Sequence, residues 1–496
     1  MREDSVQKIV FIVDSIYGIE RLGPQILVAI AKEENFIVYF YQADLISENK
    51  LIWQIKEINP DIIAYSVMTF EHKTLHSLNK RLKSELDFIS IFGGPHYTFN
   101  PEEIYTHQHI DIICVGEGER AFRSFLQCMK DHEDYSKISN LIVRCGNLVK
   151  ENPIVSLIDD LDEVPFADRK VFLMDEKGRH HLGRTSIVMI GRGCPFKCTY
   201  CFNAKYNEIY RENSHRIVRW RSVGNVITEM KKIKSESTID YFSVVDDAIN
   251  LLPKDYIYEF CGQYKKEISI PFSAQFRANL IDEDIIKALH EAGMQWANCG
   301  IETGDEFVAN SILKRRITNE QLVNTFRILN KYSIKNFSQN IIGLPVEDPV
   351  GNAFKTIALN IKAKVGYAHF TILLPFPKTP IEKYCIEHGY LPYGGIKQLG
   401  DITPSVFTKT ILKFPRSKDR ERLTNLHKFC GIAVRFPLLI PMIKLLIELP
   451  PNRFFQYVYF LFYAYYRSIA PYKIKLSPSL IFRGFKQVLS YLRRHD

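Results

Sequence analysis

Short apolar runs alternate with helix-length amphipathic segments over the first third of the chain. Each run is rich in Ile, Val, Phe or Tyr, and helix candidates at 21–33, 71–85 and 119–130 lie between the runs. Continuous apolar strands that alternate with helices are typical of a parallel sheet covered by helices on both faces. The pattern therefore predicts a doubly wound α/β domain whose strands are 8–13, 37–42, 61–67, 89–94 and 111–117.

A second alternating series follows a segment, 133–183, that looks like a linker with one hairpin, 141–144 and 148–151. Strands are expected at 187–190, 241–245, 272–277, 297–301, 337–342 and 369–374, with helices at 223–233, 255–266, 283–292, 319–331, 352–363 and 380–388. Six β/α units predict a partial barrel. In such a fold, the active site lies at the carboxyl ends of the strands.

Composition indicates a folded globular protein, and the distribution of charge bears on whether it binds nucleic acid. Hydrophobic residues make up 46% and charged residues 24% of 496 residues, as in ordinary globular domains. The net charge is +9, but residues 451–496 alone hold eight Lys or Arg and one Asp. Because the rest is nearly neutral, we expect no nucleic-acid partner. The first residues show no secretory pattern, so we expect a cytoplasmic location.

Three of the ten cysteines crowd into eight residues and indicate a metal centre. Cys194, Cys198 and Cys201 have the spacing C-x3-C-x2-C on a glycine-flanked loop directly after an expected strand. Fe–S clusters normally take four protein thiolates, so a compact set of three leaves one iron free for another ligand. The alternative is a zinc site completed by a distant His or Cys. Zinc sites favour two separated pairs of ligands, and the sequence has no second pair.

This spacing, with Tyr200 directly before the last cysteine, resembles the radical S-adenosylmethionine superfamily over residues 185–391. In that family the amino and carboxylate groups of S-adenosylmethionine chelate the free iron of a 4Fe–4S cluster. The resemblance implies that Tyr200 lies beside the adenine, that Arg277 faces the methionyl carboxylate, and that Glu302 binds the ribose. The usual Gly-Gly-Glu of the second strand is replaced by Val245-Asp246-Asp247. Taken singly, each residue that the resemblance assigns to S-adenosylmethionine binding could instead be a helix cap, a surface group or part of a turn. The assigned residues are Tyr200, Asp246, Asp247, Arg277, Glu302, Asn340 and Gly343.

Glycines at the strand ends of the first domain resemble those of the cobalamin-binding domain that precedes many radical enzymes. Glycines there let backbone amides approach a large flat ligand. Dinucleotides and flavins use similar strand ends, but no G-x-G-x-x-G follows the first strand. The Asp-x-His-x-x-Gly motif that supplies a histidine to cobalt is absent, so a cobalamin here would lack a histidine lower ligand. The implied cobalamin residues are Gly18, Ser66, Gly93, Gly94, His96, Gly116, Glu117 and Gly118.

The expected organisation is therefore a Rossmann-like cobalamin-binding domain (1–132), a linker (133–183), a partial (β/α)6 radical S-adenosylmethionine core (184–392) and a helical C-terminal region (393–496). Within the last region, residues 454–466 contain nine aromatics in thirteen positions, between Arg453 and Arg467. This stretch is too short to span a bilayer. It fits either a helical lid with an aromatic core or a peripheral membrane contact.

The resemblance implies a cobalamin-dependent radical enzyme that methylates an unactivated carbon of a small-molecule or lipid-like substrate through a 5′-deoxyadenosyl radical. It further implies a reducing electron donor such as flavodoxin or ferredoxin. A radical cyclase or carbon-skeleton enzyme with the same cofactors is the alternative within enzymes. A non-catalytic cluster- and cobalamin-binding sensor is the alternative of another class, although sensing needs no substrate clamp.

Overall fold

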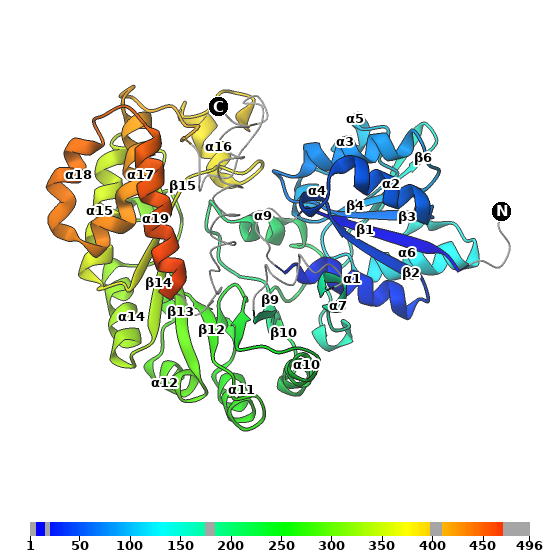
Figure 1. Ribbon diagram of the computed structural model, residues 1–496, viewed down its shortest axis with the longest axis horizontal. Helices are drawn as coiled ribbons and strands as arrows, with labels where there is room; N and C mark the ends of the chain where they lie inside the picture. The colour runs from blue at the N-terminus through cyan, green and yellow to red at the C-terminus, as the bar shows by residue number, and fades with distance from the viewer. Residues whose placement is uncertain (1–5, 15–19, 174–183, 397–408, 470–496) are drawn as a thin grey trace.

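The computed structural model describes residues 6–14, 20–173, 184–396 and 409–469. Two α/β units lie side by side, and the short helix α9 (Phe202–Ile209) lies between them (Figure 1). The N-terminal unit contains a seven-stranded sheet and the following unit a six-stranded sheet. The predicted order of a doubly wound domain, a partial barrel and a helical C-terminal segment is confirmed.

The N-terminal sheet has the strand order β2-β1-β3-β4-β5-β6-β7, and its first five strands are parallel. Helices α1 and α6 pack on one face of the sheet, and α2 and α3 pack on the other. Because both faces are covered, the strands are apolar along their whole length. The elements are β1 (Lys8–Val13), α1 (Leu22–Glu33), β2 (Ile37–Gln42), η1 (Ala43–Leu45), α2 (Glu48–Ile58), β3 (Ile62–Ser66), α3 (His72–Lys83), β4 (Ile89–Gly93), α4 (Pro95–Phe99), α5 (Glu103–Thr106), β5 (Ile112–Cys114), α6 (Glu119–Asp131) and η2 (Tyr135–Lys137).

The hairpin β6 (Leu141–Cys145) and β7 (Leu148–Glu151) belongs to this sheet, which corrects its placement in a linker. Strand β6 pairs antiparallel with β5, and β7 pairs with β6. Leu141 and Val143 are buried. The hairpin therefore covers the backbone groups that β5 would otherwise expose at a sheet edge.

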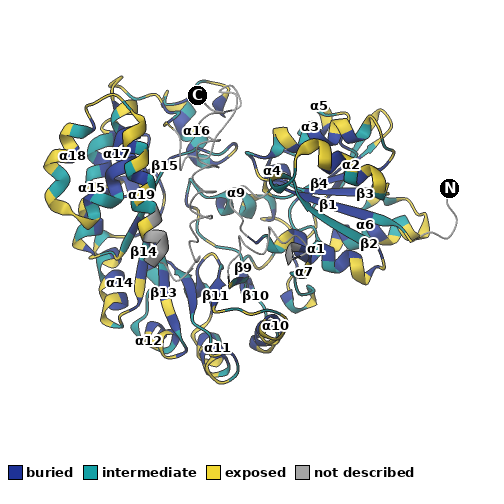
Figure 2. Ribbon diagram, viewed as in Figure 1, coloured by how far each residue is buried: buried dark blue, intermediate teal, exposed yellow. Residues whose placement is uncertain are grey.

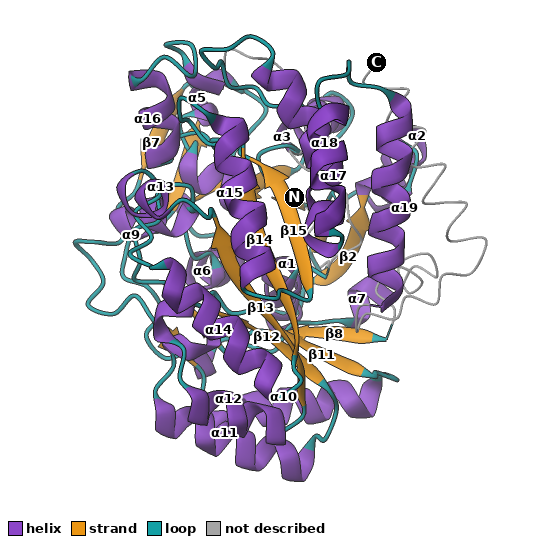
Figure 3. Ribbon diagram, turned by 90° about the vertical axis from the view of Figure 1, so that its left-hand side faces the viewer, coloured by secondary structure: helices purple, strands orange, loops and turns teal. Residues whose placement is uncertain are grey.

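The second sheet is the expected partial barrel, with six parallel strands in the order β15-β14-β13-β12-β11-β8. Figure 3 shows these strands beside the helices that cover them, and Figure 2 shows buried strands with helices exposed on their outer faces. The elements are η3 (Leu161–Glu163), α7 (Lys170–Leu173), β8 (Thr185–Val188), β9 (Gly191–Arg192), β10 (Arg219–Trp220), α10 (Val223–Glu236), β11 (Tyr241–Val244), η4 (Ile249–Leu251), α11 (Lys254–Glu267), β12 (Phe272–Phe276), η5 (Ala278–Leu280), α12 (Glu283–Glu291), β13 (Met294–Glu302), α13 (Glu306–Ser311), α14 (Asn319–Lys331), β14 (Lys335–Ile342), α15 (Pro349–Lys362), β15 (Tyr367–Ile372) and α16 (Pro380–Glu387).

The C-terminal region packs against the β15 side of the barrel. It consists of α17 (Asp419–Arg435), η7 (Pro437–Leu439), α18 (Ile440–Leu446) and α19 (Arg453–Ile469). Helix α19 buries Phe455 and Tyr459 against α17, while Phe454 and Leu461 are exposed. The aromatic segment is thus a helix with one packed face. Among the described residues, no helix is both long and apolar enough to cross a membrane.

Candidate active site

The three cysteines lie on the loop between β9 and α9, where Cys198 is buried and Cys194 and Cys201 are half-buried. Burial raises the pKa of the Cys194 thiol to about 11 and that of Cys201 to about 12, and the charges of Asp247 and the neighbouring thiols add to both shifts. Thiolates this crowded need a cation beside them. The donor set therefore fits a metal cluster, because iron would stabilise the charged form that burial disfavours.

Contacts from two other segments fix the cysteine loop. Gly193 has φ +94°, and a Cβ atom there would collide with the carbonyl oxygen of Ile217. The backbone N–H of Thr199 donates to the carbonyl of Leu313 at 3.1 Å, and the Thr199 hydroxyl donates to that of Ile312 at 2.8 Å. The loop is therefore held from both sides before any ligand binds.

Arg277 reaches the cysteine loop, as the sequence predicts for a residue that binds a carboxylate there. Its guanidinium lies 3.4 Å from the ring centroid of Phe196, and its Nη1 lies 3.6 Å from Cys198 Sγ. Its Nε is buried and has no hydrogen-bond partner among the described residues. An unpaired buried donor on a guanidinium fits an anionic ligand such as the methionyl carboxylate.

Glu302 ends β13 and faces a second buried guanidinium, that of Arg315. The two are joined by an ion pair of 3.7 Å between Arg315 Nη1 and Glu302 Oε1, and the Tyr200 hydroxyl hydrogen-bonds to Glu302. Burial raises the pKa of Glu302, while Arg315 counteracts that shift. Arg315 Nε and Nη1 are buried with no hydrogen-bond partner in the described part of the chain. This constellation can hold a polar ligand such as the ribose and its neighbouring groups.

The Asp246 carboxylate is engaged by backbone groups, and its contact with S-adenosylmethionine stays a prediction. Its carboxylate accepts the backbone N–H groups of Ile190 at 2.8 Å and Gly191 at 3.0 Å. Burial raises its pKa to about 7. The side chain thus holds the strand that leads into the cysteine loop. Asp247, whose carboxylate accepts from Asn203 at 2.6 Å near the thiols, remains the candidate for the methionyl amine.

The side chain of Asn340 is also committed elsewhere. Its Nδ2 donates to Ser338 Oγ at 2.8 Å and to the His369 carbonyl at 2.9 Å, and its Oδ1 accepts from Asn360 at 2.7 Å. It therefore joins β14 to β15 and α15, and an adenine contact by this residue stays a prediction. Gly343, at φ +69° just beyond β14, stays a predicted contact.

The glycine loop after β4 has the close backbone approach expected of a cobalamin site. Gly94 has φ +94°, and a Cβ there would lie 2.8 Å from the backbone nitrogen of Val67. Gly93 and Ser66 pair with each other in neighbouring strands at the same sheet edge. These residues and Gly118 remain predicted cobalamin contacts. Gly18 lies outside the described residues.

Glu117 and Gly116 connect the two units, a role that the sequence does not reveal. Both oxygens of Glu117 accept from Arg219, at 2.8 and 2.9 Å, and Arg192 lies 3.2 Å from the same carboxylate. Its backbone N–H donates to the Tyr210 hydroxyl at 2.8 Å. A side chain at Gly116 would collide with that hydroxyl. The Glu117 carboxylate and backbone N–H are therefore both occupied at the joint, and its cobalamin contact stays a prediction.

An aromatic contact places the two candidate cofactor sites next to each other. Phe99, at the end of α4, stacks on Phe202 with ring centroids 5.0 Å apart, and Phe202 directly follows Cys201. Phe376, after β15, contacts Phe202 at 4.8 Å. The glycine loop of the first unit and the cysteine loop of the second thus share one apolar wall.

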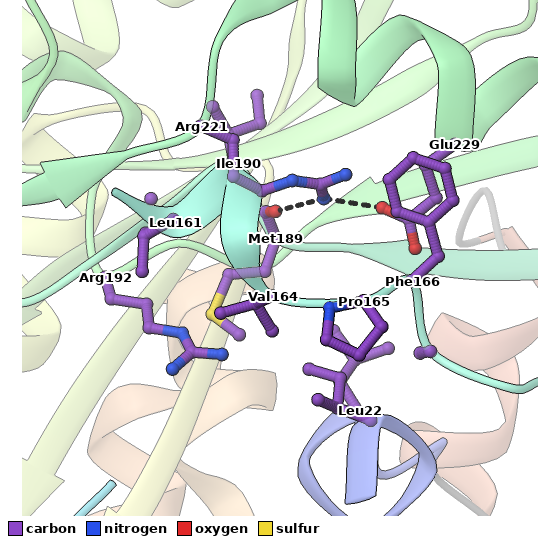
Figure 4. Close-up of a pocket in the computed structure, with 13 residues that line it drawn as sticks. Leu22, Leu161, Val164, Pro165, Phe166, Met189, Ile190, Arg192, Arg221 and Glu229 are labelled. Carbon is purple, nitrogen blue, oxygen red and sulfur yellow. Dashed lines mark hydrogen bonds and ion pairs between the residues drawn. The ribbon is translucent and has the colours of Figure 1, made fainter. Parts of the chain in front are cut away.

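A small pocket at the joint lies apart from these groups. It is formed by α1, the segment around Pro165 and the β8–β9 turn, and none of the predicted cofactor residues lines it (Figure 4). Arg221 donates there to the carbonyl of Met189 at 3.1 Å and to Glu229 at 2.5 Å. The ion pair satisfies the only acidic group in the lining, so this pocket is a packing feature.

Family comparisons agree with this division of the chain. Residues 188–350 match the radical SAM superfamily, and residues 10–126 match the B12 binding domain. The chain is a radical S-adenosylmethionine enzyme with a cobalamin-binding domain. Its cofactors are a 4Fe–4S cluster, S-adenosylmethionine and cobalamin, in agreement with the crowded thiols and with the buried nitrogens of Arg277 and Arg315 that lack a hydrogen-bond partner among the described residues.

Three known proteins are similar to this chain over most of its length. An uncharacterized methyltransferase of Pyrococcus horikoshii is 27% identical over 379 residues, which are 75% of this chain and 79% of that protein. An anaerobic magnesium-protoporphyrin IX monomethyl ester cyclase of Cereibacter sphaeroides is 22% identical over 68% of this chain and 55% of its own length. The structure of the radical S-adenosylmethionine methyltransferase TsrM from Kitasatospora setae, with cobalamin and a 4Fe–4S cluster bound, has a TM-score of 0.63 at 14% identity, covering 77% of this chain and 79% of that one. This last likeness concerns the fold.

Sequence reasoning missed four functional residues, which are Arg315, Arg192, Arg219 and Tyr210. Arg315 stands in a run of three basic residues that resembles a solvated surface turn. Its pairing with Glu302 spans a turn and a helix and leaves no periodic signal. Only the position of a basic residue shortly after the Glu302 segment could have suggested it.

Proposed function

We propose that the enzyme methylates an unactivated carbon of a small-molecule or lipid-like substrate, using S-adenosylmethionine both as radical source and as methyl source. The observation that carries the proposal is the Phe99–Phe202 stack, because it joins the glycine loop to the cysteine loop. A methyl donor and a radical source must both reach one substrate carbon. The likeness to a methyltransferase over 79% of that protein's length also supports this reaction.

When bound at Cys194, Cys198 and Cys201, the cluster with S-adenosylmethionine would supply radical hydrogen abstraction, and cobalamin at the glycine loop would supply the methyl group. The side chains of the protein orient the bound cofactors and shield them from water. Arg277 and Arg315 present buried donors to the methionyl and ribosyl groups, and the Glu302 carboxylate accepts hydrogen bonds from hydroxyl groups. The aromatic wall of Phe99, Phe202 and Phe376 lines the space between the sites with apolar rings, and an apolar lining disfavours water there.

A radical cyclase is the second candidate, favoured by the similarity to the protoporphyrin ester cyclase. The amounts of the two nucleoside products formed from S-adenosylmethionine distinguish the two reactions. Cobalamin-loaded, reconstituted protein is reduced under anaerobic conditions with a flavodoxin- or ferredoxin-type donor and given S-adenosylmethionine. A methylase should form about one S-adenosylhomocysteine per bound cobalamin, beside 5′-deoxyadenosine. Formation of 5′-deoxyadenosine without S-adenosylhomocysteine would favour the cyclase. The Cys198→Ala variant, which cannot hold the cluster, is the control for background cleavage.

A lipid-like substrate and a cytoplasmic, membrane-peripheral location form the finer part of the proposal. Their support is a set of exposed apolar side chains near the end of the described chain, with basic side chains at Arg435, Lys444 and Arg453. The exposed apolar residues are Phe436, Leu438, Met442, Leu445, Leu449, Phe454 and Leu461. Such surfaces suit a bilayer interface. Sedimentation with phosphatidylglycerol vesicles should be lost in the Leu438→Glu/Leu445→Glu variant and weakened by salt. A variant that still sediments like the wild type would remove this support.

A further inference from the structure

Two segments that contact each other at the cysteine site carry exposed basic side chains. Lys197 lies on the cysteine loop, Lys314 and Arg316 follow α13, and all three side chains are exposed. The backbone N–H of Thr199 donates to the carbonyl of Leu313 at 3.1 Å. Lys197 is two residues from Thr199, a stretch of chain that spans at most about 7 Å, and Lys314 directly follows Leu313. These three residues therefore form one basic surface beside the thiols.

The charge of the basic surface is not neutralised by ion pairs. None of its three cations has an acidic partner in the described part of the chain. The other charged residues of 194–201 and 306–316 are Arg315, which is buried, and Glu306, whose carboxylate accepts the backbone N–H of Asn319 at 2.8 Å. By contrast, the nearby Lys378 pairs with Glu102 at 2.6 Å. Exposed cations without partners keep their attraction for an approaching acidic molecule.

The backbone at two of these residues is one that Lys and Arg seldom adopt. Lys314 has φ +52° and Arg316 has φ +55°, in the left-handed region that favours Gly and Asn. Between them, Arg315 turns inward and pairs with Glu302. Gly or Asn would form the same turn with less strain, so the presence of two long cationic side chains favours a role for their charge.

An exposed aromatic ring adjoins the basic surface. Phe307 on α13 is 72% exposed, and Ser311, one turn further along the same helix, is exposed as well. Helix α13 leads directly into the segment that contacts the cysteine loop, and α9, α13 and α16 lie on the same side of the view in Figure 3. Protein interfaces combine an apolar or aromatic centre with charged groups at the rim. The surface therefore has the composition of a protein-binding site.

We propose that the basic surface and Phe307 bind a small acidic electron-transfer protein that reduces the cluster. Cys194 and Cys201 are half-buried, so the loop that holds the cluster reaches the molecular surface here. One electron leaves the reduced carrier, which is thereby oxidised, and enters the cluster, which is reduced; no atom or proton is transferred. Complementary charges speed the encounter and fix the orientation of a transient complex. The competing interpretation is a solvated basic turn that binds no protein.

Two acidic carriers, a flavodoxin and a 2Fe–2S ferredoxin, are the probes for this inference. The full-length, cluster- and cobalamin-loaded protein is titrated with each oxidised carrier, and low-temperature electron paramagnetic resonance follows reduction of the cluster by the reduced carrier. The variant Lys197→Gln/Lys314→Asn/Arg316→Asn removes the three charges, and Asn tolerates the left-handed backbone. Its affinity for the carrier should fall roughly tenfold. Salt should weaken binding to the wild type and have little effect on the variant.

The chain offers a matched control far from the cysteine site. Lys364 is exposed, has φ +51°, and lies just before β15 at the amino ends of the strands, and Lys287 is exposed on α12. Lys364→Asn/Lys287→Gln should therefore bind both carriers like the wild type. Photoreduced deazaflavin, a small-molecule reductant that needs no docking surface, should reduce the cluster equally in all three proteins. Iron content and S-adenosylmethionine affinity should also be equal.

Several outcomes would overturn the inference. They are a wild type that binds neither carrier, equal carrier affinity in the wild type and the basic-surface variant, and an equal loss of affinity in the Lys364→Asn/Lys287→Gln control. Loss of reduction by deazaflavin in the basic-surface variant would also overturn it, because the substitutions would then have altered the cluster itself. The proposed methylation does not enter these measurements, since carrier binding and cluster reduction precede any reaction with a substrate.

Discussion

At the scale of single residues, the sequence points to groups that belong to a motif and misses residues that contact the motif but lie outside it in the sequence. Cys194, Arg277 and Glu302 were predictable because each stands in a short segment with its own pattern. Arg315 was not, because the burial of its guanidinium depends on how the turn after α13 folds back onto β13. For Asp246 and Asn340 the sequence does not reveal that backbone and neighbouring amides hydrogen-bond to their side chains.

Replacing Arg315 by Met should weaken binding of S-adenosylmethionine and leave the cluster in place. Hydrogen bonds to a charged group contribute about 1.5–3 kcal/mol, so affinity should fall roughly 10- to 100-fold. Arg316→Met is the control, since that neighbour is exposed. Equilibrium binding of S-adenosylmethionine and iron analysis measure the two effects. An unchanged affinity, or a loss of iron equal to that of the cysteine variants, would contradict the assignment of Arg315 to this ligand.

At the scale of elements, hydrophobic alternation located nearly every strand of both sheets. It did so because a strand buried on both faces must be apolar throughout, which is a strong local signal. The hairpin β6–β7 was recognised as a hairpin but assigned to a linker. Which sheet edge a hairpin joins depends on the exposed backbone of β5, and no local pattern encodes that. The packed face of α19 was left open for the same reason, since its partner α17 is remote along the chain.

Helix α17 contains a buried cation whose removal should stabilise the C-terminal region. Lys428 is 6% exposed, and burial lowers its pKa to about 8. Below pH 8 this lysine is charged in both folded and unfolded chains, so the full cost of burying the charge, about 3 kcal/mol, is present. As pH rises from 8 to 10.5, the folded state loses the proton first and the wild type gains stability relative to a variant without the amine.

We therefore expect Lys428→Met to unfold at a higher temperature than the wild type at pH 7, with the difference shrinking toward pH 10. Thermal unfolding followed by circular dichroism across this range measures it. The exposed Lys444→Met serves as control and should show no such dependence. A constant difference between pH 7 and pH 10 would mean that the burial of the charge is not its cause.

At the scale of the whole molecule, the order of domains was predictable and their joint was not. Domain order follows from two separate series of strands and the motifs at their ends. The joint depends on residues far apart in the sequence, such as Glu117 with Arg219 and Phe99 with Phe202. No periodicity records such pairs. They nevertheless hold the glycine loop of one unit against the cysteine loop of the other.

Glu117→Gln should loosen this joint and reduce turnover more than it reduces cofactor binding. Arg219 is 1% exposed and would lose a bidentate carboxylate partner; breaking a buried pair in this way costs about 3–5 kcal/mol. Burial would raise the pKa of Glu117, but Arg219 and Arg192 lower it. The pair therefore stabilises the fold at pH values above the ordinary pKa of a glutamate, and this stabilisation is lost on acidification.

Glu163→Gln is the control: its ion pair with Arg120 is exposed, so the substitution should change the free energy of unfolding by less than about 1 kcal/mol. The measurements are the unfolding temperature at pH 7, cobalamin and iron content, and the amounts of S-adenosylhomocysteine and 5′-deoxyadenosine formed. Equal effects of the two variants, or a Glu117→Gln protein that loses cobalamin as fully as it loses turnover, would argue that Glu117 serves the cofactor and not the joint.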